Sequence, residues 1–132
     1  MKLFELLNAL PSLRRLSELK FSSFKKVREI AILRKKVEEE VDFYVKEERN
    51  LIDTYATKGE DGNPIILEGG RIKLDSKESK NKFETEIGKL RELEIDDISK
   101  VSLTDSDFGD SNNLPTPEEI LVLESVINFK ED

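Results

Sequence analysis

The sequence predicts a mainly α-helical protein with a small β-hairpin, in which a long helix folds back on a second helix as a coiled-coil-like helical hairpin, followed by a C-terminal helix. Two observations support this fold class. Residues 23–57 contain no Gly or Pro and carry apolar residues at heptad spacing. Residues 65–74 read IILEGGRIKL, so two glycines separate two short apolar segments. A chain of 132 residues suits a single domain.

The composition favours long helices and excludes several kinds of site. Charged residues make up 39% of the chain, which leaves a thin core and narrow apolar stripes. Cys and His are absent, so thiolate metal sites and the usual general base are excluded. No segment approaches the roughly 18 apolar residues of a membrane span. The N-terminal segment has no cleavage signal, and we interpret it as a folded helix. We expect a cytoplasmic protein without a cofactor.

Charge is distributed unevenly along the chain. From Glu84 onward there are fourteen Asp and Glu against four Lys and Arg. Such an acidic half repels phosphate, so we expect no direct nucleic-acid binding. The long helix carries a basic cluster, which we interpret as intrahelical pairing of Arg34 with Glu38 and of Lys36 with Glu40. The cluster consists of Lys25, Lys26, Arg28, Arg34, Lys35 and Lys36.

Residues 1–21 predict two short helices. Leu residues recur at spacings of three and four on both sides of Pro11, which is the pattern of one helical face. Because Pro is unfavourable inside a helix, we expect a break at Pro11.

Residues 22–93 predict a helix, a β-hairpin and a second helix. The first helix extends from about Ser23 to Thr57, and a helix so long and so charged needs a partner helix along its length. Its seam repeats every seven residues, with a second row offset by four. The seam residues are Ile30, Val37, Tyr44 and Leu51, with Val27, Val41 and Tyr55 in the second row. We expect Val37, Val41, Tyr44 and Tyr55 to take part in interactions.

The hairpin has a predicted register. With Gly69 and Gly70 as a two-residue turn, Leu67 lies opposite Ile72. Because successive side chains of a strand point to opposite faces, one face of the hairpin is apolar. This face consists of Ile65, Leu67, Ile72 and Leu74. We expect it to pack on the helices or on another molecule. A second helix then covers residues 77–93, with Phe83, Ile87, Leu90 and Leu93 on one side.

Residues 94–132 predict an acidic extended segment and a final helix. A short strand is expected at residues 101–103. Thr116 as N-cap, Pro117 at the first helical position and Glu119 as the partner in a capping box mark the start of the helix. One face of the helix is expected to contain Ile120, Leu123, Val126 and Ile127.

The acidic motifs do not fit known metal or catalytic patterns. In the loop from Asp105 to Asp110, Gly109 and Asp110 stand in the reverse of the EF-hand order, and Thr116 occupies the place of the final Glu. Asp96 and Asp97 are adjacent in an extended segment and point apart. We expect no metal site and no catalytic site.

Two of the motifs resemble those of a known group. The turn EDGNP at residues 60–64 after a long helix, and the start LPTPEE of the last helix, are similar to motifs of small uncharacterised proteins of tailed bacteriophages and prophages. Here an additional Pro115 stands in the second motif. The resemblance covers about residues 25–128 and implies a phage origin and a non-enzymatic role.

Three functions stay open at this point. The first is a protein–protein interaction or assembly protein of a phage, binding a partner or itself through the helical seam and the hairpin, in the host cytoplasm or the virion. The second is an inhibitor of a host defence protein that uses the acidic C-terminal surface. The third is a small enzyme or cation-binding regulator centred on the Asp loop. We favour the first because the helical seam is explicit.

Overall fold

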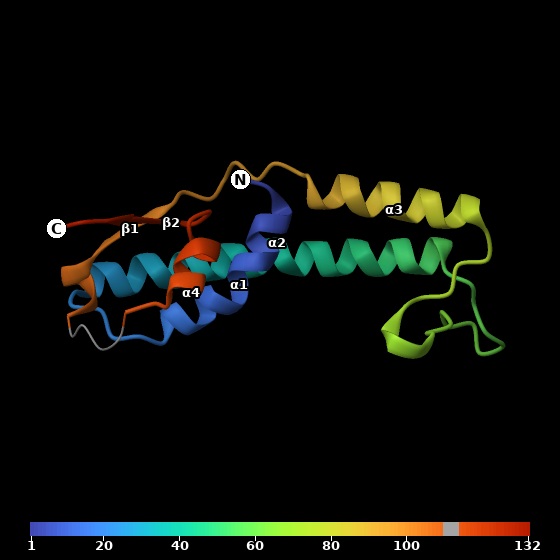
Figure 1. Cartoon of the computed structure of the whole chain (residues 1–132), viewed down its shortest axis with the longest axis horizontal. Coiled ribbons are helices and arrows are strands. Elements are labelled where there is room, and N and C mark those ends of the chain that lie inside the picture. The colour runs from blue at the N-terminus through green and yellow to red at the C-terminus, as the bar shows by residue number, and fades with distance from the viewer. Residues whose placement is uncertain (110–113) are drawn as a thin grey trace. The chain divides into compact units, whose positions relative to one another are not determined.

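The computed structural model of the chain describes residues 1–109 and 114–132. Figure 1 shows a mainly helical chain with a small sheet, which confirms the predicted fold class. The helices are α1 (Leu3–Ser17), α2 (Phe24–Tyr55), α3 (Lys77–Arg91) and α4 (Pro117–Leu123), and the strands are β1 (Val101–Thr104) and β2 (Ile127–Lys130). In the described part of the chain, no helix combines the length and the apolar character that crossing a membrane requires.

These elements form two compact units. The first contains Met1–Val41 and Glu94–Asp132, and the second contains Asp42–Leu93. The uninterrupted helix α2 contributes to both, and its bounds confirm the predicted long helix. The seam of α2 is therefore divided, because Ile30 and Val37 belong to the core of the first unit and Tyr44 to that of the second.

Helix α1 is one continuous helix, so the predicted break at Pro11 is wrong. A proline inside a helix costs about 3 kcal/mol through its lost hydrogen bond and its ring clash. Here the apolar face continues on both sides of Pro11, and its burial outweighs that cost. The buried residues of the face are Leu3, Leu6, Ala9, Leu10, Leu13 and Leu16.

Strands β1 and β2 form a two-stranded parallel sheet in which Val101 pairs with Ile127 and Leu103 with Phe129. Strand β1 confirms the strand expected at residues 101–103, whereas β2 was not expected. The capping box of Thr116 and Glu119 at the start of α4 is confirmed. The helix, however, ends at Leu123, so the expectation that Val126 and Ile127 continue its face is wrong.

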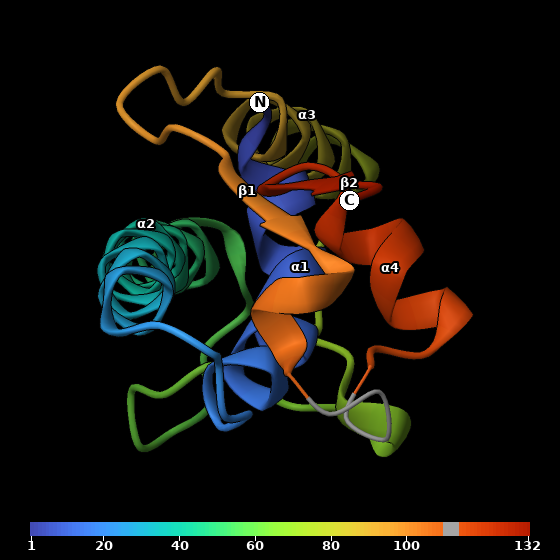
Figure 2. The ribbon, with the colours of Figure 1, turned by 90° about the vertical axis from the view of Figure 1, so that its left-hand side faces the viewer.

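The core of the first unit lies around α1. Figure 2 shows α1 between α2 on one side and α4 on the other, with the strands beside it. Leu103, Leu123, Val126 and Ile127 are all buried. The turn after β1 is the 3₁₀ helix η2 (Asp105–Phe108), whose Phe108 is buried, its ring centroid 5.5 Å from that of Phe21.

The second unit has a thinner core. Helix α3 runs antiparallel to the second part of α2, and its N-cap Ser76 accepts a hydrogen bond from the Ser79 amide. Tyr44, Ala56 and Leu90 are its buried apolar residues in the described structure. The connecting segment is held by backbone hydrogen bonds from Thr57 N to Lys73 O at 2.8 Å and from Lys73 N to Ile65 O at 2.9 Å.

The predicted hairpin reverses direction but in a different register. Ile66, and not Leu67, lies opposite Ile72, in a single antiparallel bridge, and Leu67 N donates to Arg71 O at 2.6 Å. The turn begins one residue early, as the 3₁₀ segment η1 (Glu68–Gly70), because Gly69 adopts φ 83° and ψ 9°. That conformation suits the third position of a type II turn and requires Gly. A shift of one residue moves each side chain to the other face.

Candidate functional site

The four seam residues expected to take part in interactions do not form an open surface. Val37 and Tyr44 have exposed fractions of 0% and 5%, and each side chain packs inside its own unit. Val41 and Tyr55 are half-buried. The seam is therefore mainly core.

The hairpin residues are divided between contact and exposure. Ile65, Ile72 and Leu74 are half-buried, whereas Leu67 is 42% exposed. Its neighbour Ile66, which the predicted register left unexplained, is 60% exposed. The apolar tip of the hairpin thus consists of Ile66 and Leu67.

An apolar groove lies between the second part of α2 and α3, within the second unit. It has a volume of about 270 Å³. Phe43 and Leu93 flank it and are each 43% exposed. Its lining consists of Phe43, Glu47, Leu51, Glu86, Lys89, Leu90 and Leu93. We call this the α2–α3 groove.

A polar bridge ties the two helices together beside this groove. Tyr44 Oη donates to Glu48 Oε2 at 2.7 Å and accepts from Arg91 Nε at 3.3 Å. Burial raises the pKa of the Tyr44 hydroxyl, and a phenol is already neutral near pH 7, so it donates its hydrogen bond to Glu48. The bridge therefore fixes the helix pair in neutral solution.

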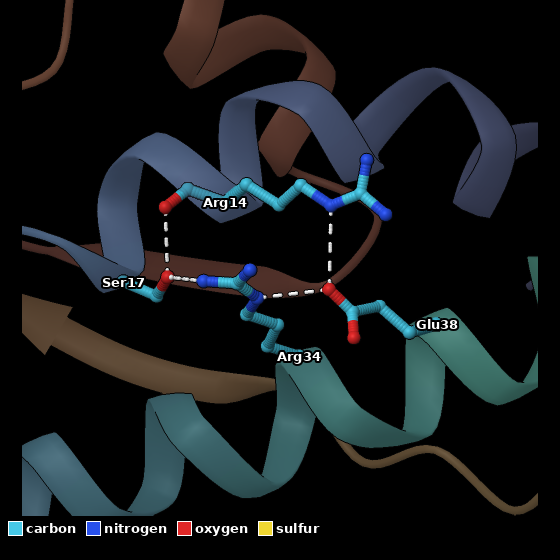
Figure 3. Close-up of polar contacts among 4 residues, drawn as sticks. All are labelled: Arg14, Ser17, Arg34 and Glu38. Carbon is cyan, nitrogen blue, oxygen red and sulfur yellow. Dashed lines mark hydrogen bonds and ion pairs between the residues drawn. The ribbon is translucent and has the colours of Figure 1, made fainter.

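In the first unit, two arginines share one carboxylate (Figure 3). Glu38 Oε1 accepts from Arg34 Nε at 2.9 Å and from Arg14 Nε at 3.3 Å. Arg34 Nη1 also donates to Ser17 Oγ at 2.7 Å. Hydrogen bonds from Arg34 and then Arg14 lower the pKa of the Glu38 carboxyl. The predicted pairing of Arg34 with Glu38 is confirmed, and it joins α1 to α2.

Carboxylates hold the acidic loop after β1 in place. Asp107 Oδ2 accepts from Thr104 N at 2.8 Å, and outside the loop Asp132 Oδ1 accepts from the Ser106 hydroxyl at 2.7 Å. Asp110 lies outside the described residues. Among residues 1–109 and 114–132, no group of three His, Cys, Asp or Glu side chains is placed to hold a metal ion. The adjacent Asp96 and Asp97 are exposed.

Sequence reasoning missed the α2–α3 groove because it followed only the heptad seam. Phe43 and Leu51 are eight residues apart, and Leu90 and Leu93 are three apart, so both pairs fit one helical face. The heptad seam did not include Phe43. The spacing of these apolar residues indicates a second, wider apolar stripe beside the seam.

Comparison with known families gives one result. A model of a family described as a protein of unknown function (DUF1617) matches residues 4–127, which is nearly the whole chain. The chain belongs to this family. Neither a curated protein nor a solved structure matches it. The match therefore assigns the chain to a family without defining its function.

Proposed function

We propose that this chain is a non-enzymatic, phage-encoded protein–protein interaction or assembly protein. The observation that carries the proposal is the α2–α3 groove, with Phe43 and Leu93 exposed on its two sides. A groove between two antiparallel helices suits an amphipathic helix, whose apolar side chains enter it at helical spacing. The occupant is a helix of a partner protein or of a second copy.

The rim of the groove supports this kind of occupant. Lys89 Nζ lies 3.3 Å from Glu86 Oε1 in an exposed ion pair, and Glu47 lies on the opposite helix. Charged rims around an apolar centre add specificity and exclude wrong partners more than they add affinity. The exposed hairpin tip of Ile66 and Leu67 gives a second apolar contact on the same unit.

The phage origin is part of the proposal and depends on two local motifs. In the turn of residues 60–64, Asp61 Oδ1 accepts from Asn63 N at 3.0 Å, and Gly62 adopts φ 80°. At α4, Thr116 Oγ1 accepts from Glu119 N at 3.3 Å. Both motifs carry out turn and cap chemistry, so the proposed origin, with a place in the host cytoplasm or the virion, rests on the sequence resemblance. The neighbouring genes test the origin, since virion genes favour assembly.

A matched pair of substitutions tests the groove. Phe43→Glu places a charge in the groove, whereas Val45→Glu, at a position of equal 43% exposure on the same helix, does not line it. We expect Phe43→Glu to weaken self-association, or capture of a partner from host lysate, by about tenfold or more. Val45→Glu should leave both unchanged. Sedimentation and affinity capture measure the effect, with circular dichroism to check the fold. An equal loss in both variants would contradict the proposal.

The inhibitor hypothesis makes a different prediction for the same capture experiment. It predicts that a host nuclease is captured in stoichiometric amount. The Phe43→Glu variant should still capture this nuclease, whereas a variant with both Asp96→Lys and Asp97→Lys should not. Both aspartates are exposed and available to such a partner. If the Asp variants still capture a partner and Phe43→Glu does not, the result supports binding in the α2–α3 groove.

A further inference from the structure

A hollow of the first unit lies between the first part of α2 and the start of β1, two segments about seventy residues apart in the sequence. Its volume is about 410 Å³. It is lined by Lys26, Glu29, Ile32, Leu33, Lys36, Ser99, Lys100, Val101 and Ser102. We call it the lysine pocket, because three of these nine residues are lysines in a chain with a net charge of −7.

One of the three lysines is held in place by the protein. Lys26 Nζ donates to Ser102 O at 2.7 Å and lies 3.4 Å from Glu29 Oε2. Its side chain is therefore fixed across the pocket, from α2 to β1. Glu29 neutralises one of the three positive charges.

The other two lysines are available to a ligand. Lys36 and Lys100 are exposed, and within residues 1–109 and 114–132 neither makes an ion pair or a side-chain hydrogen bond. The expected pairing of Lys36 with Glu40 is not formed. Glu40 has a pKa raised by burial and by the nearby Asp97, and no cation contributes to it. Two like charges that share a hollow repel each other, so the stability of the fold gives no reason for this arrangement.

The pocket also has an apolar wall. Leu33 is buried, Val101 is half-buried, and Ile32 is 38% exposed. Ligand sites typically combine such a wall with a few converging polar groups. Ser99 and Ser102 also line the pocket, and the Ser102 carbonyl accepts from Lys26.

We propose that the lysine pocket binds a small organic phosphomonoester. Because Glu29 pairs with Lys26, the lining residues leave two positive charges, which match the charge of −1.5 to −2 on a phosphomonoester near neutral pH. Lysine ammonium groups bind phosphate as compact point charges. The organic group of the ligand then lies against Ile32 and Val101. This inference is independent of the α2–α3 groove, because every lining residue belongs to the first unit.

The test uses phenyl phosphate, inorganic phosphate and phenol as probes of the full chain. We expect phenyl phosphate to bind more tightly than inorganic phosphate, phenol not to bind, and the affinity to fall as salt is added. Lys36→Ala and Lys100→Ala should each weaken phenyl phosphate binding by about tenfold. Lys35→Ala is the matched control, since this exposed lysine of the same helix does not line the pocket.

Calorimetric titration and NMR shifts of Ser99, Val101 and Ser102 amides measure the binding. No binding of phenyl phosphate at millimolar concentration, or an equal loss with Lys35→Ala, would overturn the proposal. Equal affinity for inorganic and phenyl phosphate would overturn the claim that the pocket recognises the organic group of the ligand. Cosedimentation with vesicles of phosphatidic acid and phosphatidylcholine, lost in the two pocket variants, would identify a lipid headgroup and overturn the small molecule. Lys36 and Lys100 are exposed, so their replacement is compatible with the fold. Lys36→Gln repeats the test with a side chain of similar length.

Discussion

Two carboxyl groups of α2 that are two residues apart have opposite pKa shifts. Glu38 is held by hydrogen bonds from Arg34 and Arg14, which lower its pKa below the ordinary 4.5. Glu40 loses solvent and faces Asp97 and Glu39, so its pKa is raised above 4.5. The same residue type on one helix therefore stabilises the fold at one position and opposes it at the other.

For Glu38 we expect Glu38→Gln to lower the stability at pH 7. A carboxyl with a lowered pKa in the folded state contributes stability above the pKa of the unfolded chain and loses it as the pH falls through the folded pKa. The difference between variant and parent should therefore be present at pH 7 and become smaller as the pH falls below 4.5 through the folded pKa. Chemical denaturation at pH 7 and pH 3 measures it. An equal difference at both pH values would show that Glu38 acts through packing instead of charge.

For Glu40 the sign is reversed, and we expect Glu40→Gln to raise the stability at pH 7. A raised pKa means that ionisation is unfavourable in the folded state, so the penalty exists above the folded pKa and is absent below that of the unfolded chain. The melting temperature of the variant should exceed that of the parent at pH 7 and equal it near pH 3. Asp42→Asn, at an exposed acid of the same helix, is the control and should change little.

Val37 gives a prediction about the core. It is completely buried in the first unit, so Val37→Asp places an unpaired charge among apolar side chains and should cost several kcal/mol of unfolding free energy. Val45→Asp, at a position of the same helix that is 43% exposed, should stay within about 0.5 kcal/mol of the parent. Urea denaturation compares the two. Equal stabilities would mean that Val37 is not part of a core.

At the scale of elements, helices and strands that depend on neighbouring residues could be predicted from the sequence. Pairings between residues far apart in the sequence could not. The long helix, the start of α3 at residue 77, the strand at β1 and the capping box at Thr116 all depend on residues close together in the sequence, and all are confirmed. Strand β2 was missed because its partner β1 lies 26 residues earlier in the parallel register. The hairpin register failed by one residue, since both Gly69 and Gly70 have φ values that fit several turns.

The candidate site was less predictable than the fold. The residues of the seam were correctly identified as apolar and contacting, but whether a stripe meets its own chain or a partner is not encoded in its spacing. Val37 and Tyr44 are core, whereas Phe43, one position away, lines the groove. The lysine pocket brings together Lys36 and Lys100, which are more than sixty residues apart in the sequence, so no local pattern predicts it.

Helix α1 gives a prediction at the element scale. Pro11 is exposed in the middle of an unbroken helix, so Pro11→Ala restores a backbone donor and removes a ring clash. Because Ala also allows more freedom in the unfolded chain, we expect a net gain of about 1–2 kcal/mol. Asn8→Ala, at an exposed position of the same helix, controls for helix propensity. A destabilised Pro11→Ala variant would show that the proline conformation itself is required.

At the scale of the whole molecule, the two units differ in the amount of apolar surface that they bury. The first unit has fifteen buried apolar residues in the described structure, and the second has Tyr44, Ala56 and Leu90. Burial opposes local opening, so regions with few buried apolar contacts exchange their amide hydrogens more readily. The thinner unit is also the one that carries the α2–α3 groove, where a partner would add the missing contacts.

Hydrogen exchange along α2 tests this difference within one continuous helix. We expect the amides of residues 30–40 to be protected well above those of residues 44–54, because Ile30, Leu33 and Val37 are buried at 2% exposure or less. Helical hydrogen bonding is common to both segments, so it cancels in the comparison. Exchange of the second segment should slow further when the groove is occupied, since binding stabilises the folded unit by mass action. Uniform protection along α2 in the free protein would contradict the assignment of a weaker unit.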